Sequence, residues 1–126
     1  MRDVVSTPNA AAPTAAYSQG VRAGDLIWTA GTVGLDPATG KAVSDVFEEQ
    51  VHAAIGHLQA VLEAAGSGLD HVIKTTCWVT NREDFLKLDA VYTTYFSAPP
   101  PARTTVVCDL VFEELLFEIE AVARIP

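Results

Sequence analysis

Apolar residues recur at helical spacing in two stretches of the chain. Between residues 45 and 65 they return every three or four positions while polar residues fall on the opposite side, a pattern that predicts an amphipathic helix. Ser44 or Asp45 can cap the first turn of this helix, and Gly66 can end it in the left-handed conformation. The pattern therefore predicts one long helix with a single buried face.

A second helix is predicted from Arg82 to Phe96, with Asn81 as its cap. Its buried side chains are expected to be Phe85, Leu88, Tyr92, Tyr95 and Phe96. The proline-rich tract at residues 97–102 ends this helix, because three consecutive prolines fix φ and remove three N–H donors. This stiff tract delivers Arg103 to the start of the next strand.

Strand patterns occupy much of the remaining chain. Residues 26–30 form a short β-prone run, and Gly24 before them can supply the positive φ of a hairpin turn. Residues 71–80 are rich in β-branched and aromatic side chains without clean alternation, which predicts a central strand covered on both faces. Residues 103–112 and 116–125 are expected to form two strands joined by an acidic turn.

The order of these elements predicts an α+β fold. Helices between strands require parallel pairing, whereas the strands next to each other at both ends favour antiparallel hairpins, so we expect a mixed sheet with both helices on one face. No repeat or low-complexity linker divides residues 1–126, which are interpreted as a single domain. The other face of the sheet would lack cover within the chain, and this predicts self-association.

Composition and charge exclude several classes of function. The 126 residues include 8 Lys+Arg and 16 Asp+Glu, a formal net charge of −8 that disfavours binding to nucleic acid or to anionic membranes. A hydrophobic content of 49% with only 19% charged residues is too apolar for a disordered chain. Neither a signal peptide nor an apolar stretch of membrane-spanning length is recognised, so a cytoplasmic protein is expected.

The cysteines and histidines do not form a metal-binding pattern. Cys77 and Cys108 stand 31 positions apart, outside any Cys-x-x-Cys motif, and are expected to be buried free thiols. His52 and His57 would point about 140° apart on their helix and could not share a metal ion. These two histidines and His71 are interpreted as surface or boundary residues, and no metal site is predicted.

Two sets of residues could carry chemistry. On the last strand the odd-numbered positions are apolar, so Glu118 and Glu120 share the other face, about 7 Å apart. A solvated strand face is the plainer interpretation, but partial burial would raise the pKa of a glutamate toward the range useful in acid–base catalysis. Arg103 stands alone among apolar and hydroxyl residues; it could be an ordinary surface residue, yet its planar fork suits a carboxylate.

Five short blocks resemble, in order and spacing, the YjgF/RidA family of reactive-intermediate deaminases. The blocks are Tyr17–Gly20, Trp28–Gly31, Val72–Thr76, Pro101–Thr104 and Phe117–Ala121. The resemblance extends over essentially the whole chain. It implies a chorismate-mutase-like α+β fold that assembles into a barrel-like homotrimer, with a cleft between each pair of subunits.

The resemblance also implies an activity. It is the hydrolysis of reactive enamines or imines, such as 2-aminoacrylate, to a 2-keto acid and ammonia without a cofactor, as in a 2-iminobutanoate/2-iminopropanoate deaminase. By position, Arg103 matches the arginine that pairs with the substrate carboxylate, and Glu118 matches the glutamate that activates water. Thr105 stands where many members have a cysteine whose backbone meets the substrate nitrogen. The cleft would be lined by Tyr17, Ala30 and Gly31.

The chain departs from the family pattern near this cleft. Ala30 and Thr32 stand where the best-known branch has serine and glutamine, and Asp89 stands where asparagine is common. Asp89 could place a second negative charge near the cleft. Two alternatives therefore stay open: a pathway-specific member acting on a larger enamine such as 2-aminomuconate, and a non-catalytic ligand-binding or holdase-like trimer. Nuclease activity, reported for some relatives, is disfavoured by the acidic charge.

Overall fold

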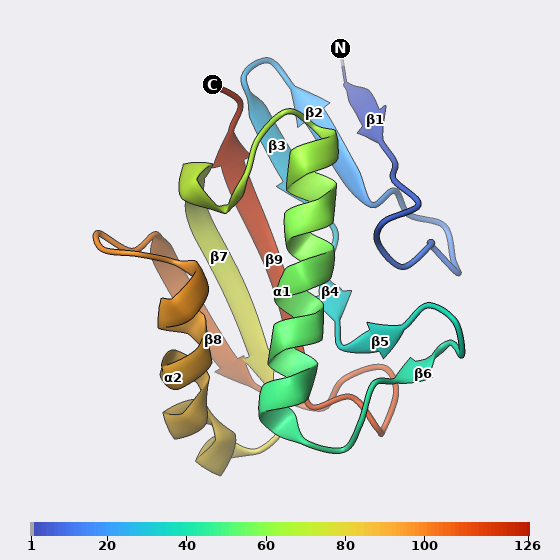
Figure 1. Ribbon diagram of the computed structural model, residues 1–126, viewed down its shortest axis with the longest axis vertical. Helices are drawn as coiled ribbons and strands as arrows, with labels where there is room; N and C mark the ends of the chain where they lie inside the picture. Colours follow the sequence, from blue (N-terminus) through green and yellow to red (C-terminus); the bar gives the residue numbers. More distant parts are fainter. Residues whose placement is uncertain (1) are drawn as a thin grey trace.

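Two helices pack on one face of a mixed sheet in the computed structural model, which describes residues 2–126 (Figure 1). The elements are β1 (Asp3–Val5), β2 (Gly20–Ala23), β3 (Leu26–Thr29), β4 (Thr32–Val33), β5 (Leu35–Asp36), β6 (Lys41–Ala42), α1 (Phe47–Ala64), β7 (Val72–Val79), α2 (Phe85–Tyr95), β8 (Ala102–Val107) and β9 (Phe117–Arg124). Short 3₁₀ turns at Leu69–His71 and Arg82–Asp84 precede β7 and α2. The expected α+β fold with both helices on one face is confirmed.

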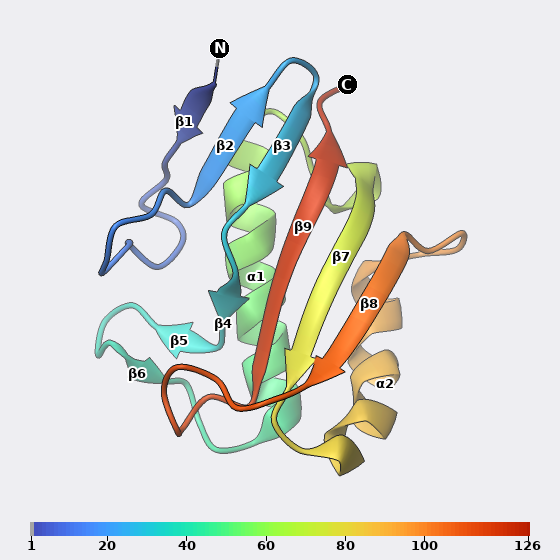
Figure 2. The ribbon, with the colours of Figure 1, turned by 180° about the vertical axis from the view of Figure 1, so that it is seen from behind.

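The last strand lies in the middle of the sheet. The strand order is β1-β2-β3-β9-β7-β8, with β4 also pairing with β9 (Figure 2). Only β7 and β8 pair in parallel, because α2 connects them as a crossover, and the other strand pairs in the described residues are antiparallel. The predicted mixed sheet is confirmed, but the predicted hairpin between residues 103–112 and 116–125 is wrong. Strand β9 pairs with β3 and β7 because its apolar row suits the covered centre.

The segment between β8 and β9 is a long loop. Strand β8 ends at Val107 rather than at Phe112, and the side chain of Phe112 is 57% exposed. Cys108 is exposed at the start of this loop, which corrects the prediction of a buried thiol, whereas Cys77 is buried as predicted. The β-prone composition of residues 108–112 predicted too long a strand, because the pairing of β8 with β7 ends where β7 ends, at the pair Val79–Val107.

Helix α1 ends as the sequence predicts but begins differently. Gly66 has a φ of +81°, its N–H donates to the Glu63 carbonyl, and the Ser67 N–H donates to the Leu62 carbonyl, which forms a Schellman ending. At the start, Val46 is the capping position and has no side-chain cap. The predicted cap at residues 44–45 is therefore wrong.

Helix α2 buries a slightly different stripe from the predicted one. Leu88, Val91 and Tyr92 are its buried side chains, whereas Phe85 is partly exposed. Asn81 lies before the 3₁₀ turn that precedes the helix and makes no side-chain capping bond, contrary to prediction. The core lies between both helices and the sheet, and its largest fully buried apolar side chains are Ile27, Ile55, Leu58, Leu62, Leu88, Phe117 and Ile119.

The second face of the sheet is open, as Figure 2 shows. Trp28 is 44% exposed there, and the register places Glu118, Trp78 and Val106 side by side on the same face. Strand β7 is central as predicted, but within the chain it is covered on one face only, which corrects the expectation of cover on both. Within residues 2–126, none of the helices combines the length and apolar character needed to span a membrane.

Candidate functional site

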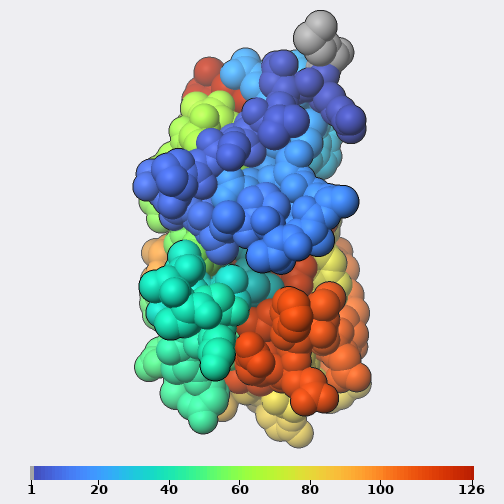
Figure 3. All heavy atoms as spheres, turned by 90° about the vertical axis from the view of Figure 1, so that its right-hand side faces the viewer, coloured from blue at the N-terminus to red at the C-terminus, as the bar shows by residue number. Residues whose placement is uncertain are grey.

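A cleft of about 400 Å³ opens beside the end of the sheet. Three loop segments surround it, together with one side of α1 and the start of β9: the N-terminal stretch before β2, the chain from Ala30 to Leu35, and the loop before β9. Figure 3 shows these segments together on one side of the molecule. The lining residues are Ala10, Ala11, Ala12, Thr14, Ala15, Tyr17, Gln19, Ala30, Gly31, Thr32, Val33, Leu35, His57, Val61, Val111, Phe112, Leu115 and Glu118. The wall is therefore mostly apolar, with one carboxyl group.

That carboxyl group belongs to Glu118, which is half-buried at the start of β9. Burial, and secondarily the charge of Glu120 on the same strand face, raise the pKa of the Glu118 carboxyl above its usual range. A side chain at Gly31 would collide with the Glu118 carboxylate, because a Cβ there would lie 2.8 Å from Cδ. The glycine thus leaves the space that the carboxyl occupies.

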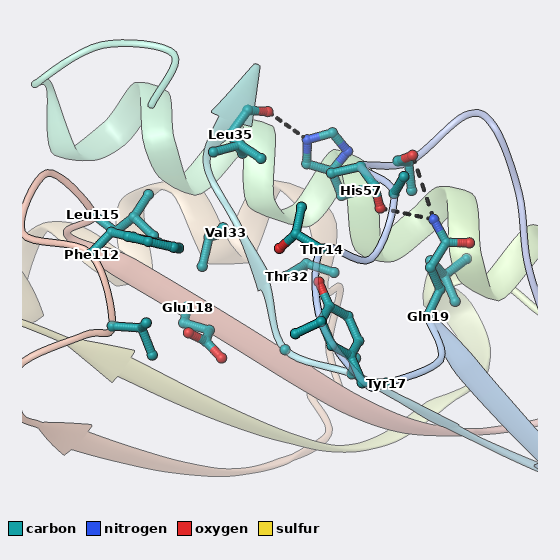
Figure 4. Close-up of a pocket in the computed structure, with 18 residues that line it drawn as sticks. Thr14, Tyr17, Gln19, Thr32, Val33, Leu35, His57, Phe112, Leu115 and Glu118 are labelled. Carbon is teal, nitrogen blue, oxygen red and sulfur yellow. Dashed lines mark hydrogen bonds between the residues drawn. The ribbon is translucent and has the colours of Figure 1, made fainter. Parts of the chain in front are cut away.

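The glutamine Gln19 holds the N-terminal wall of the cleft. Its side-chain oxygen accepts a hydrogen bond from the Thr7 N–H at 2.7 Å, and its amide nitrogen donates to the carbonyls of Thr7 and Ala11 at 3.1 and 2.9 Å. These bonds fold the segment back so that Tyr17 reaches the cleft (Figure 4). Sequence reasoning did not single out Gln19, although it lies within the first of the five family-like blocks.

A second buried glutamine holds the opposite wall. Gln50 on α1 donates to the carbonyls of Ser44 and Glu114, both at 2.9 Å, and accepts a hydrogen bond from the Leu116 N–H at 2.8 Å. Since Leu115 lines the cleft, these bonds tie the loop before β9 to the long helix. The helical period places position 50 on the same face as Phe47 and Ala54, but sequence analysis did not single out the glutamine there.

The imidazole of His57 forms part of the cleft wall, which sequence reasoning missed. Its Nε2–H donates to the Leu35 carbonyl at 2.8 Å (Figure 4), and this bond orients the ring in the wall of the cleft. The prediction of a boundary position is confirmed by its half-burial. Periodicity could not reveal the cleft, because its other walls come from segments remote in the sequence.

The remaining predicted residues form a second cluster on β8 and α2. Arg103 Nη1 donates to Asp89 Oδ1 at 2.7 Å, and its guanidinium carbon lies 4.7 Å from the centroid of the Tyr92 ring. Thr105 lies on the same side of β8, where the register pairs it with the buried Cys77. Burial raises the pKa of the Cys77 thiol to about 11, so this thiol is protonated and poorly suited to act as a nucleophile.

The two clusters lie on different parts of one protomer. The register pairs Arg103 with Thr75 and Ala121 on the helix-covered face, whereas Glu118 pairs with Trp78 on the open face. Strand β8, which carries Arg103, is also an edge strand. Tyr17, Ala30, Gly31 and Glu118 therefore meet in the cleft, while Arg103, Thr105 and Asp89 do not reach it. No group of three metal-ligating side chains is found within residues 2–126.

Comparisons with known proteins match nearly the whole chain. The family model described as Endoribonuclease L-PSP matches residues 7–125. A RutC family protein of Pyrococcus horikoshii is 38% identical over 123 residues, which cover 98% of each chain. The chloroplastic Reactive Intermediate Deaminase A of Arabidopsis thaliana is 36% identical over 124 residues, covering 98% of this chain and 66% of that protein.

Solved structures agree in fold. RidA from the Antarctic bacterium Psychrobacter sp. superposes with a TM-score of 0.91 at 30% identity, covering 97% of this chain and 98% of that one. Escherichia coli TdcF with bound serine superposes with a TM-score of 0.90 at 28% identity, again covering 97% and 98%. The likeness in fold thus extends over nearly the whole chain.

Proposed function

This chain belongs to the YjgF/RidA family, and from that premise we propose that it hydrolyses reactive enamines or imines, such as 2-aminoacrylate, to a 2-keto acid and ammonia. The observation that carries the proposal is Glu118, a half-buried carboxyl of raised pKa in the wall of an otherwise apolar cleft. Such a group can accept a proton from water and return it to a leaving nitrogen at neutral pH.

Two relatives support this class of substrate. The Arabidopsis relative is named a reactive intermediate deaminase, and the TdcF structure holds serine, a small molecule with a carboxylate and a nitrogen on the adjacent carbon. A 2-imino acid presents the same two groups. The proposed substrate is therefore a small carboxylate, and the proposed reaction uses water and no cofactor.

The residues would divide the reaction between them. Arg103 would bind the substrate carboxylate, with Thr105 beside it, and thereby fix the position of the C=N carbon. An enamine first becomes the imine by taking up a proton at its terminal carbon. Glu118 would take a proton from a water molecule as the water oxygen bonds to the carbon of the protonated imine, which gives a carbinolamine. It would then pass that proton to nitrogen and accept the hydroxyl proton as the C–N bond breaks, which releases the 2-keto acid and ammonia, and ammonia or solvent would take up the remaining proton.

This mechanism requires two protomers, because Arg103 and Glu118 lie apart in one chain. The β8 edge of one protomer would meet the cleft of the next, so the two contact surfaces differ. Such head-to-tail contacts close into rings, and we propose a homotrimer with three clefts between subunits. The open sheet face with Trp28 would be covered in this assembly. Two free cysteines suit a reducing, cytoplasmic location.

A coupled assay tests the activity. Serine dehydratase would generate 2-aminoacrylate, and the appearance of pyruvate would be followed with and without the protein. We expect the wild type to accelerate pyruvate release, and Arg103→Ala and Glu118→Gln each to lower kcat/KM by about 10²- to 10⁴-fold. Glu63→Gln, a matched change at an exposed position of α1, should have full activity. A wild type no faster than buffer would contradict the proposal.

The volume of the cleft favours a larger enamine as a second candidate. A space of about 400 Å³ exceeds what a three-carbon substrate needs and has room for a longer molecule such as 2-aminomuconate. A comparison of kcat/KM between 2-aminoacrylate and longer enamines would distinguish the two. Saturable binding of such molecules without turnover would instead favour a non-catalytic ligand-binding trimer.

A further inference from the structure

Asp89 occupies one side of the guanidinium proposed to bind substrate. Its Oδ1 accepts the hydrogen bond from Arg103 Nη1 at 2.7 Å, which uses one of the five N–H donors of the arginine. The Asp89 side chain is 62% exposed and that of Arg103 only 20% exposed. The carboxylate therefore lies on the solvent side of the cation, and an incoming anion must approach a charge that is already partly neutralised.

The aromatic ring of Tyr92 also packs against the Arg103 guanidinium and restricts its orientation. The guanidinium carbon lies 4.7 Å from the centroid of the Tyr92 ring, a distance typical of a cation–π contact. The Tyr92 hydroxyl is in turn bonded to Thr75 Oγ1 at 2.8 Å in the buried interior. Because Thr75 is the neighbour of Arg103 across the β7–β8 pair, helix and sheet together define the plane of the guanidinium.

The charges around the proposed site favour the binding of a substrate with one carboxylate over that of a substrate with two. The cleft that would contribute Glu118 has no lysine or arginine in its lining, as far as residues 2–126 show. On the neighbouring strand, Lys74 bonds to Thr104 Oγ1 on the open face, away from Arg103. A substrate with two carboxylates would thus meet a single cation together with the acids Asp89 and Glu118.

We propose that Asp89 is a positioning and specificity-determining residue: it orients Arg103, and its charge restricts the site to imines that carry one carboxylate. This inference rests on the proposed function in one respect, the role of Arg103 in binding the substrate carboxylate. It distinguishes among the larger substrates that the cleft could hold, because it favours an apolar side chain over the second carboxylate of a molecule such as 2-aminomuconate.

An equilibrium binding experiment tests the specificity without requiring turnover. Calorimetric titration of the assembled protein would compare 2-oxobutanoate, a monocarboxylate, with 2-oxoglutarate, a dicarboxylate. We expect the wild type to prefer 2-oxobutanoate, and Asp89→Asn to reduce that preference by about three- to fivefold, since a dianion gains more than a monoanion when a nearby negative charge is removed. Asp3→Asn removes one charge at the opposite edge of the sheet and should leave the preference unchanged.

A second pair of measurements tests the positioning role. The side-chain oxygen of Asp89→Asn can still accept the Nη1 hydrogen bond, whereas Asp89→Ala offers no acceptor. With an imine substrate we expect kcat within about twofold of wild type for the asparagine variant and about tenfold lower for alanine. An unchanged preference in Asp89→Asn, equal kcat losses in both variants, or no saturable binding of 2-oxobutanoate would overturn the inference. Binding with the expected preference but without turnover would contradict only the proposed deaminase activity.

Discussion

At Gly31 the backbone passes beside the carboxyl group that is proposed to activate water. A Cβ there would collide with the end of the Glu118 side chain, which can swing away because it is flexible. We therefore expect Gly31→Ala to lower kcat by at least about tenfold while changing the midpoint of thermal unfolding little, since the misplaced group is the carboxyl and not the core. The enamine assay and a thermal scan on the same sample would show both effects.

A matched control exists on α1. Gly56 is exposed, and a Cβ there would meet no atom within 4 Å. Gly56→Ala should leave kcat unchanged and stabilise the protein by about 0.5–1 kcal/mol, because alanine loses less entropy in a helix. If Gly31→Ala kept full activity, the proposed role of the Glu118 position would be wrong.

The raised pKa of Glu118 makes stability depend on pH in a defined direction. Burial first, and the Glu120 charge second, raise this pKa above the ordinary 4.5, so the folded state binds the proton more tightly than the unfolded chain does. The resulting stabilisation is complete below pH 4.5 and is lost as the pH rises through the folded-state value. Glu118→Gln lacks this titration.

We therefore expect the variant to gain stability relative to wild type as the pH rises from 4 to 8. Urea unfolding across that range would measure the difference in the free energy of unfolding. A difference that stays constant with pH would show that the carboxyl titrates in the folded protein as it does in the unfolded chain.

At the scale of elements, one buried side chain connects α1 to the loop before β9. Gln50 makes three hydrogen bonds from a fully buried position, one of them with the Leu116 N–H. Gln50→Ala would leave those backbone groups without partners, and we expect a loss of about 2–4 kcal/mol in the free energy of unfolding. Faster hydrogen exchange at the Leu116 amide would locate the effect in the loop.

The corresponding control is Gln59→Ala on the same helix. Its side chain bonds only to Glu63, four residues along an exposed face, so its loss should cost less than about 0.5 kcal/mol. Similar losses in both variants would mean that the Gln50 bonds add nothing beyond helix propensity.

The periodicity of apolar residues predicted which segments form helices and strands better than it predicted which strands pair with one another. The alternation from Phe117 onward correctly identified a strand with one buried face, and the apolar period correctly identified α1. Alternation says nothing about which strand lies alongside, so the sequence offered no sign that β9 leaves β8 and pairs with β3 and β7. The N-terminal caps of both helices were missed because the chain approaches α1 and α2 through local turns, whereas the end of α1 at Gly66 was predicted correctly.

The residues of the candidate site were likewise predictable only in part from the sequence. Glu118 and Arg103 stood out because each is a charged residue in an apolar context, and the structure adds their separation on opposite faces of the sheet. Gln19 and His57 gave no such signal, since their roles come from carbonyl groups outside their own elements. Gln50 did stand within the apolar stripe of α1, but the helical period could not show that it binds the Glu114 carbonyl. A local sequence pattern indicates the chemical character of one segment, whereas the cleft is built from several segments that are far apart in the sequence.

At the scale of the whole molecule, we expect a mixed assembly of two inactive variants to regain activity. If each site combines Arg103 of one protomer with Glu118 of the next, a trimer containing Arg103→Ala and Glu118→Gln chains has some sites with both native residues. Random mixing of equal amounts should restore about one quarter of the wild-type activity, because each of the two native residues is present in half of the chains.

The mixture would be unfolded and refolded together, with each variant refolded alone as the control. Sedimentation would establish whether the assembly is a trimer. A mixture as inactive as its components would place both residues in one protomer or show that the chain acts alone, and either result would contradict the proposed inter-subunit site.

The central position of β9 affects how the chain can fold as it is made. This strand pairs with β3, β4 and β7, yet it follows all three of them in the sequence and is made after them. Until then the β2–β3 hairpin and the β7–β8 pair have no strand between them, and the apolar sides of both helices lack part of their sheet. Folding of the sheet must therefore wait until residues 117–124 have been made, so premature termination before residue 117 would release a protein with its interior exposed.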